Sequence, residues 1–279
     1  MLFTRSKFFN PNIQNNNKFK IKKKPTFLFK KNVDMNVSVK KKNINTQVIK
    51  PIIPLNVYQT WFTKDLPIYM KKNINYMKKI NPEFTFHLYD DKDCRDFIEK
   101  YFDKVIVDAF DKLKPGAYKA DLWRLCILYI NGGIYMDIKL VCVNNFKLIS
   151  LTNSEHYVED RPKPLSIYNA LMVSSKGNKF LHNSIQKICY NVMINYYGNS
   201  PLDITGPVLL GNIILNNKYN LIIDLVHKRS SKNNGYILYK GNVVMKTEYP
   251  QYFKERLISY NNINTKRYDQ MWKEKNIYN

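Results

Sequence analysis

Residues 117–140, AYKADLWRLCILYINGGIYMDIKL, predict a helix followed by an abrupt stop. Residues 122–130 are mostly apolar and contain no Gly or Pro, which favours a largely buried helix. The Asn-Gly-Gly sequence at 131–133 ends this helix, because glycine adopts the left-handed backbone conformation at little cost. Within the helix, Asp121 and Arg124 are three residues apart, and the simplest interpretation of the two is an ion pair of small value.

The residues after the stop predict a strand with two different faces. Residues 134–140 alternate between apolar and polar side chains, so Tyr135, Asp137 and Lys139 share one predicted face. This face offers an aromatic ring, a carboxylate and an ammonium group in a row. The pattern is compatible with a plain amphipathic strand and also with a binding site.

The stretch resembles the sugar-binding segment of glycosyltransferase family 32, retaining transferases with a DxD motif, and the related donor domains of the large glucosylating toxins. Those families follow the pattern A-x-x-x-D-x-x-R-x-x-x-L-x-x-x-G-G-x-Y-x-D-x-D. Eight positions match here, namely Ala117, Asp121, Arg124, Leu128, Gly132, Gly133, Tyr135 and Asp137. The second Asp of the DxD motif is replaced by Lys139. The resemblance implies an α/β fold of the GT-A nucleotide-sugar transferase type, with a mixed central sheet flanked by helices.

Four further segments carry the same resemblance. Residues 52–61 resemble the opening signature I-P-K-x-I-x-Q-x-W, residues 203–207 contain the T-G-P turn, and Trp272 matches the terminal H-x-x-x-W segment, although its His is missing. Residues 166–174 predict a strand, in which Asn169 begins a match to N-x-x-[ML]. A core tryptophan and a turn without a ligand remain open alternatives for the first two segments.

The resemblance assigns roles to these residues. Asp121 would bind sugar hydroxyls, Arg124 the sugar or the phosphate oxygens, and Tyr135 would pack against the donor. The candidate catalytic residues are Asp121, Arg124 and Asp137, and the candidate donor-binding residues are Thr60, Trp61, Asp121, Arg124, Gly133, Tyr135, Asp137, Lys139, Gly206 and Trp272.

A divalent cation is the cofactor that the resemblance implies, because the DxD carboxylates of the family hold one across the two donor phosphates. Mn²⁺ and Mg²⁺ favour oxygen ligands, which Asp137 can supply and a protonated Lys139 cannot. Two interpretations follow. Either Lys139 replaces part of the cation's charge, or a cation binds through Asp137, waters and the donor phosphates alone.

The charge of the chain is uneven. The net charge is +23, and residues 1–50 hold twelve Lys and one Arg against the single Asp34, which is +12 of that total. Low hydrophobicity and high charge predict a poorly ordered basic leader over 1–50 and a GT-A-like domain over 51–279. A solvated leader is favoured over one that contacts nucleic acid, since no nucleic-acid-binding motif is present.

The cysteines and the lengths of the apolar runs indicate the cellular compartment of the protein. The four cysteines have no metal-binding spacing and lie in apolar runs, which predicts buried free thiols in a reducing compartment. No apolar run approaches the ~20 residues of a membrane span, and no signal-peptide core is visible. We therefore expect a cytoplasmic or virus-associated protein. The abundance of Asn, Lys, Ile and Tyr is typical of an AT-rich genome, as in an intracellular parasite or a large DNA virus.

The leading hypothesis is a glycosyltransferase that moves a sugar from a UDP- or GDP-linked donor to a glycan, protein or lipid acceptor, with retention of configuration. The first alternative is an inactive module that binds a nucleotide sugar or a glycan through a degenerate metal site. A basic nucleic-acid-associated protein is the second. Asp90 and Asp91 are expected to cap a helix, and the resemblance offers binding of the donor base as their second interpretation. Residues 150–166 are expected to form a loop.

Overall fold

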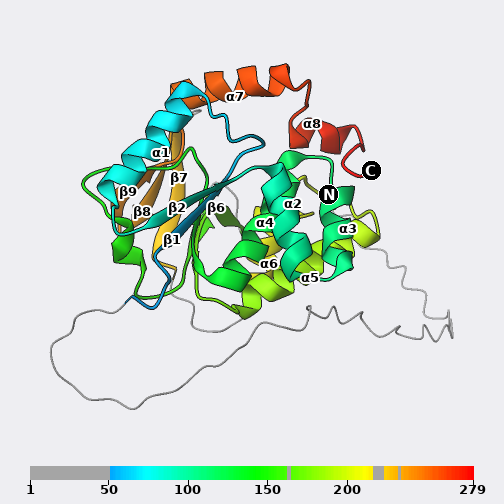
Figure 1. Cartoon of the computed structure of the whole chain (residues 1–279), viewed down its shortest axis with the longest axis horizontal. Coiled ribbons are helices and arrows are strands. Elements are labelled where there is room, and N and C mark those ends of the chain that lie inside the picture. Colours follow the sequence, from blue (N-terminus) through cyan, green and yellow to red (C-terminus); the bar gives the residue numbers. More distant parts are fainter. Residues whose placement is uncertain (1–50, 162–164, 216–222, 232–233) are drawn as a thin grey trace, which may run out of the picture.

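The computed structural model describes residues 51–161, 165–215, 223–231 and 234–279 (Figure 1). The predicted leader, residues 1–50, lies outside the described residues. The strands are β1 Asn56–Thr60, β2 Thr85–Tyr89, β3 Gly133–Met136, β4 Val141–Cys142, β5 His156–Asp160, β6 Ile167–Ser174, β7 Leu225–Ser231, β8 Asn234–Tyr239 and β9 Asn242–Lys246. The helices are α1 Ile68–Ile80, α2 Asp91–Tyr101, α3 Lys104–Lys112, α4 Gly116–Asn131, η1 Leu148–Leu151 (a 3₁₀ turn), α5 Lys179–Met193, α6 Pro207–Ile214, α7 Pro250–Asn262 and α8 Tyr268–Lys273.

Among the described residues, nine strands form one mixed sheet in the order β2-β1-β3-β6-β5-β7-β8-β9-β4. Strand β1 pairs in parallel with both β2 and β3, so the carboxyl ends of these three strands lie at one edge. Strand β6 runs antiparallel to β3 and to β5, and β7 to β9 form an antiparallel meander. The expected mixed central sheet flanked by helices is therefore confirmed.

Helices α2 to α6 gather on one side of the sheet, whereas α1 lies on the other side, with α7 near it (Figure 1). The first side holds the larger buried cluster, which is centred on α4 and includes Trp123, Leu125 and Leu128. A second cluster fills the opposite side of the sheet, and a small third cluster joins α1 to Tyr252 of α7. The buried apolar run predicted for α4 thus forms the centre of the main core.

The helix-stop-strand prediction holds at the stop and fails on the length of the strand. Helix α4 ends at Asn131, and Gly132 follows with φ +66°. Gly133 has φ +109°, and a Cβ there would lie 2.7 Å from the Asn56 carbonyl oxygen, so only glycine fits. Strand β3 stops at Met136, and residues 137–140 form a turn instead of the predicted strand. The turn is closed by the Leu140 N–H, which donates to the Asp137 carbonyl at 2.9 Å.

Two further elements differ from the sequence-based expectation. The predicted loop 150–166 contains the buried strand β5, which pairs with β6 and β7. Its buried Asp160 and His156 have partners, since Asp160 lies 2.8 Å from His227 Nδ1 and His156 lies 3.0 Å from Ser154 Oγ. Helix α7 was not predicted, and its Glu255 accepts hydrogen bonds from the first backbone N–H groups of α1. The expected cap before α2 is confirmed for Asp90, which forms a capping box with Asp93, and is wrong for Asp91, which is the first residue of the helix.

The four cysteines are free and buried, as expected. Burial raises the pKa of the Cys142 and Cys189 thiols to about 12, so these groups stay protonated and unreactive at neutral pH. No helix in the part of the chain that the structure describes is both long and apolar enough to cross a membrane.

Candidate functional site

A cavity of about 520 Å³ opens at the carboxyl ends of the parallel strands. Thr60 ends β1, Asp91 follows β2 and Asp137 follows β3, and all three line the cavity. In open α/β sheets, ligands bind at this edge. Seven of the candidate donor-binding residues meet here, namely Thr60, Trp61, Asp121, Arg124, Tyr135, Asp137 and Lys139.

Asp121 and Arg124 lie on α4 and form the inner wall of this cavity, where both are buried. The Asp121 carboxylate accepts from Asn169 Nδ2 and Thr205 Oγ1, each at 2.8 Å, and lies 3.4 Å from the Arg124 guanidinium. Arg124 also donates to the Asn169 carbonyl at 2.7 Å. Burial raises the pKa of the Asp121 carboxyl, while Arg124 and Thr205 oppose that rise. Asp121 and Arg124 therefore belong to a buried hydrogen-bonded network with Asn169 and Thr205, and they do not form the exposed ion pair of small value that was the simplest interpretation.

Asp137 is the carboxylate that remains partly open to the cavity, with 24% of its side chain exposed. Its Oδ1 accepts from the Tyr135 hydroxyl at 2.8 Å and lies 3.7 Å from Arg124, and its Oδ2 lies 3.3 Å from Lys139 Nζ. The predicted row of ring, carboxylate and ammonium is therefore present. Tyr135 lies in strand β3, whereas Asp137 and Lys139 lie in the turn that follows, so the row is formed by the strand and the turn together.

Lys139 is charged in this environment. Burial acts to lower the pKa of its ammonium group, but Tyr168 and Asp137 outweigh this effect and raise the pKa above its ordinary value. The ammonium lies 5.5 Å from the centre of the Tyr168 ring. On the other side, Tyr168 stacks on His227 with ring centres 3.9 Å apart, and His227 pairs with Asp160.

The donor set does not fit a cation held by protein carboxylates. Within residues 51–161, 165–215, 223–231 and 234–279, no group of three or more His, Cys, Asp or Glu side chains could hold a metal ion. Asp137 is the single open carboxylate of the motif, and two cationic side chains already flank it. Asp121 uses both oxygens on protein donors. Arg124 and Lys139 thus place two positive charges beside Asp137.

Residues of the opening segment and of the C-terminal segment also line the cavity. The Thr60 hydroxyl donates to the Tyr89 carbonyl at 3.0 Å, which ties β1 to β2 at the cavity edge. Trp61 stacks on Tyr260 of α7 with ring centres 6.4 Å apart. From α7, Arg256 also lines the cavity.

Three of the candidate residues do not line the cavity. Gly133 lies at the start of β3 against Asn56, at the opposite end of the strand. Gly206 lies behind Asp121, where an added Cβ would be 3.3 Å from the carboxylate. The Trp272 indole donates to the Tyr197 carbonyl at 2.6 Å and packs against the main core.

Other residues of the site were not assigned to it from the sequence. Asn169 and Thr205 lie in segments that match the family pattern, so a signal for them existed, and the structure explains it because both hold Asp121. For the stack of Tyr168 on His227, no motif gave a signal. Arg256 lies on a helix that sequence patterns did not predict.

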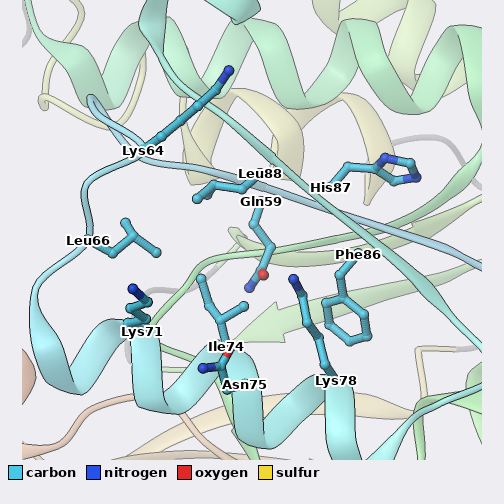
Figure 2. A pocket seen from close by; sticks show the side chains of 10 residues that line it. All are labelled: Gln59, Lys64, Leu66, Lys71, Ile74, Asn75, Lys78, Phe86, His87 and Leu88. Carbon is cyan, nitrogen blue, oxygen red and sulfur yellow. The ribbon is translucent and has the colours of Figure 1, made fainter.

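A second cavity, of about 170 Å³, lies between α1 and strands β1 and β2. Figure 2 shows Lys71 and Lys78 of α1 reaching toward it with the buried Gln59 between them. None of the candidate site residues lines this cavity, so the larger one is the candidate functional site.

Replacement of Thr205 by valine is expected to lower the free energy of unfolding by about 1.5–3 kcal/mol, because a buried carboxylate loses a hydrogen bond. The matched control is Thr152→Val. Thr152 is also a buried residue, but its hydroxyl donates to the neutral Ile149 carbonyl at 2.8 Å, for which about 0.5–1.5 kcal/mol is expected. Urea unfolding of both variants gives the comparison. Equal losses would show that Asp121 does not depend on Thr205.

Comparison with known families defines the class of protein. Residues 20–158 match the family described as glycosyltransferase sugar-binding region containing DXD motif. Over these residues, the chain belongs to this family of glycosyltransferases. The match includes α4, the Gly-Gly stop and the turn that carries Asp137.

Individual relatives share parts of the chain. The uncharacterized glycosyltransferase L373 of Acanthamoeba polyphaga mimivirus is 34% identical over 96 residues, which is 34% of this chain and 38% of the relative. Inositol phosphoceramide mannosyltransferase 3 of Schizosaccharomyces pombe is 29% identical over 167 residues, 58% of this chain and 44% of the relative. The chain thus spans less than half the length of each of these two relatives. A solved structure named PaToxG Glycosyltransferase has a TM-score of 0.48 and 17% identity, over 61% of this chain and 70% of that one.

Proposed function

We propose that the chain is a glycosyltransferase that binds a nucleotide sugar in the 520 Å³ cavity and transfers the sugar to an acceptor hydroxyl. The observation that carries this proposal is the convergence of Asp121, Arg124, Tyr135, Asp137 and Lys139 at the carboxyl edge of three parallel strands. These residues come from one family-matched stretch. A polyol with an attached diphosphate requires acceptors and cations side by side, and this wall provides both.

The proposed reaction retains configuration, as in family 32. The bond between the anomeric carbon and the donor phosphate oxygen breaks, and the acceptor oxygen forms the new bond on the same face. The acceptor proton passes to the leaving phosphate. Lys139 and Arg124 place positive charge where the diphosphate gains negative charge, and such preorganised charge is an effective source of transition-state stabilisation.

Relatives narrow the choice of substrates to be tested. Several are named mannosyltransferases, and three of them are named inositol phosphoceramide mannosyltransferases. Mannose is therefore the first sugar to test, and a lipid with a polyol head group is the first acceptor. The mimivirus relative favours a viral source and, with it, a virus-associated or cytoplasmic location.

Thermal-shift measurements against UDP- and GDP-sugars test donor binding. A true donor at about 100 times its Kd should stabilise the fold by about 2.7 kcal/mol, which raises Tm by several degrees. NMR of the product then shows whether the anomeric configuration is retained. If no nucleotide sugar raises Tm and none is hydrolysed, the proposal is wrong.

An inactive binding module is the second candidate, and it is favoured by the two cations that already neutralise Asp137. It predicts a thermal shift with a donor but no hydrolysis and no transfer. The same two measurements therefore separate the two candidates.

A further inference from the structure

Helices α1 and α7 are joined near one end and present their outer sides to solvent. The Glu255 carboxylate of α7 accepts from the Tyr69 and Met70 N–H groups at 2.7 and 3.0 Å, so it caps the amino end of α1. The two helices also share the small buried cluster of Met70, Ile74 and Tyr252. This packing holds the two helices against each other.

The two sides of α7 differ in what they contact. Tyr252, Arg256 and Tyr260, which are four residues apart, line the large cavity. Lys254, Leu257 and Ile258 occupy the opposite side by the same periodicity and are exposed. Leu257 and Ile258 leave 62% and 58% of their surface in contact with solvent. One side of the helix therefore serves the candidate site, and the other side is apolar without a partner among the described residues.

Helix α1 has the same division. Its buried side carries Met70, Ile74 and Met77. Its outer side carries Ile68, Tyr69, Lys72, Tyr76 and Lys79, all of them exposed. We name the outer residues of both helices the α1–α7 face, which comprises Ile68, Tyr69, Lys72, Tyr76, Lys79, Lys254, Leu257 and Ile258.

The charge of these two helices is predominantly positive. Helix α1 has four lysines and no acidic residue, and α7 adds Lys254 and Arg256. The one acidic residue of the pair is Glu255, which is engaged in capping α1. Exposed Ile, Leu and Tyr side chains among lysines are typical of helices that lie in the interface of a membrane and attract anionic lipids.

We propose that the α1–α7 face docks on an anionic lipid surface. Leu257, Ile258 and Ile68 enter the boundary between head groups and acyl chains, and Lys72, Lys79 and Lys254 pair with lipid phosphates. Because the opposite side of α7 lines the cavity, docking would hold the candidate site close to the lipid surface, one helix away from it. This inference does not rest on sugar transfer, since it concerns binding alone.

Sedimentation with vesicles tests the proposal on the full chain. The vesicles are phosphatidylcholine alone, or phosphatidylcholine with phosphatidylserine in about a 3:1 ratio. We expect tighter binding to the anionic vesicles, and a loss of at least about tenfold for Leu257→Ser/Ile258→Ser, because two large apolar side chains no longer enter the bilayer. Lys72→Gln/Lys79→Gln should weaken binding to the anionic vesicles alone.

The matched control is Met193→Ser/Ile194→Ser, an exposed apolar pair at the carboxyl end of α5, with 52% and 48% of the surface accessible. This pair should bind as the wild type does. The basic residues 1–50 are present in every variant, so their contribution is constant. The proposal is wrong if the Leu257/Ile258 variant binds as the wild type does, or if the control pair loses as much. If the Leu257→Ser/Ile258→Ser variant binds vesicles as the wild type does but differs from it in molar mass by light scattering, the face would be assigned to a protein partner instead of a lipid surface.

Discussion

Protein in which Asp137 is replaced by alanine is expected to remain folded and to lose sugar transfer and donor hydrolysis by at least about 100-fold. Asp137 is the open carboxylate of the motif and holds together the Tyr135 hydroxyl, Arg124 and Lys139. Without it, the two cations lose the group that sets their positions at the cavity wall. Steady-state transfer assays and circular dichroism melts measure the two parts of the prediction.

Two variants make this result specific. Asp137→Asn keeps the shape of the side chain and removes its charge, so a similar loss would assign the effect to charge. Asp108→Ala removes an exposed carboxylate on α3 that pairs with Lys104, and it should leave activity unchanged. An Asp137→Ala protein with near-full turnover would rule out this residue as part of the site.

The second large effect concerns metal dependence. If Lys139 supplies the charge that a divalent cation supplies in DxD relatives, wild-type activity should persist in EDTA, and Mn²⁺ should add little. Lys139→Asp restores the DxD spacing beside Asp137, and the ratio of activity in Mn²⁺ to activity in EDTA should rise at least about tenfold, or about 1.4 kcal/mol of transition-state stabilisation. An ammonium group has half the charge of a divalent ion and cannot bridge Asp137 to both phosphates, so its compensation should be incomplete.

Lys139→Gln provides the control, because it removes the ammonium group and adds no carboxylate. It should lower activity without a gain in metal dependence. The alternative is that a cation binds through Asp137, waters and the donor phosphates. Complete loss of wild-type activity in EDTA with full recovery in Mn²⁺ would establish that alternative and refute the role of Lys139.

The sequence predicted the parts of the site that lie within one short stretch of the chain. The apolar run of α4, the Gly132 stop and the grouping of Tyr135 with Asp137 and Lys139 all follow from spacing within one stretch. The turn after Met136 was missed because alternation alone does not distinguish a long strand from a short one followed by a turn.

Contacts between residues far apart in the chain could not be predicted from local sequence patterns. Strand β5 is polar enough to suggest a loop, and its burial depends on His227, which is 67 residues from Asp160. Helix α7 has a weak apolar pattern, since one of its sides faces the cavity and another faces solvent. Propensity and periodicity do not report such long-range pairing.

The way that distant segments meet also has a consequence for the order of events during synthesis. Asp121 is held by residues 48 and 84 positions later, and the cap on α1 comes from a residue about 185 positions after it. A nascent chain that has been synthesised only as far as α4 therefore carries Asp121 and Arg124 before their partners Asn169 and Thr205 exist. Contacts of such long sequence separation slow folding, because loop closure precedes the gain from each contact. We expect the cavity to assemble only after α7 has left the ribosome, so that chaperone engagement before that point would affect yield more than it affects the stability of the finished fold.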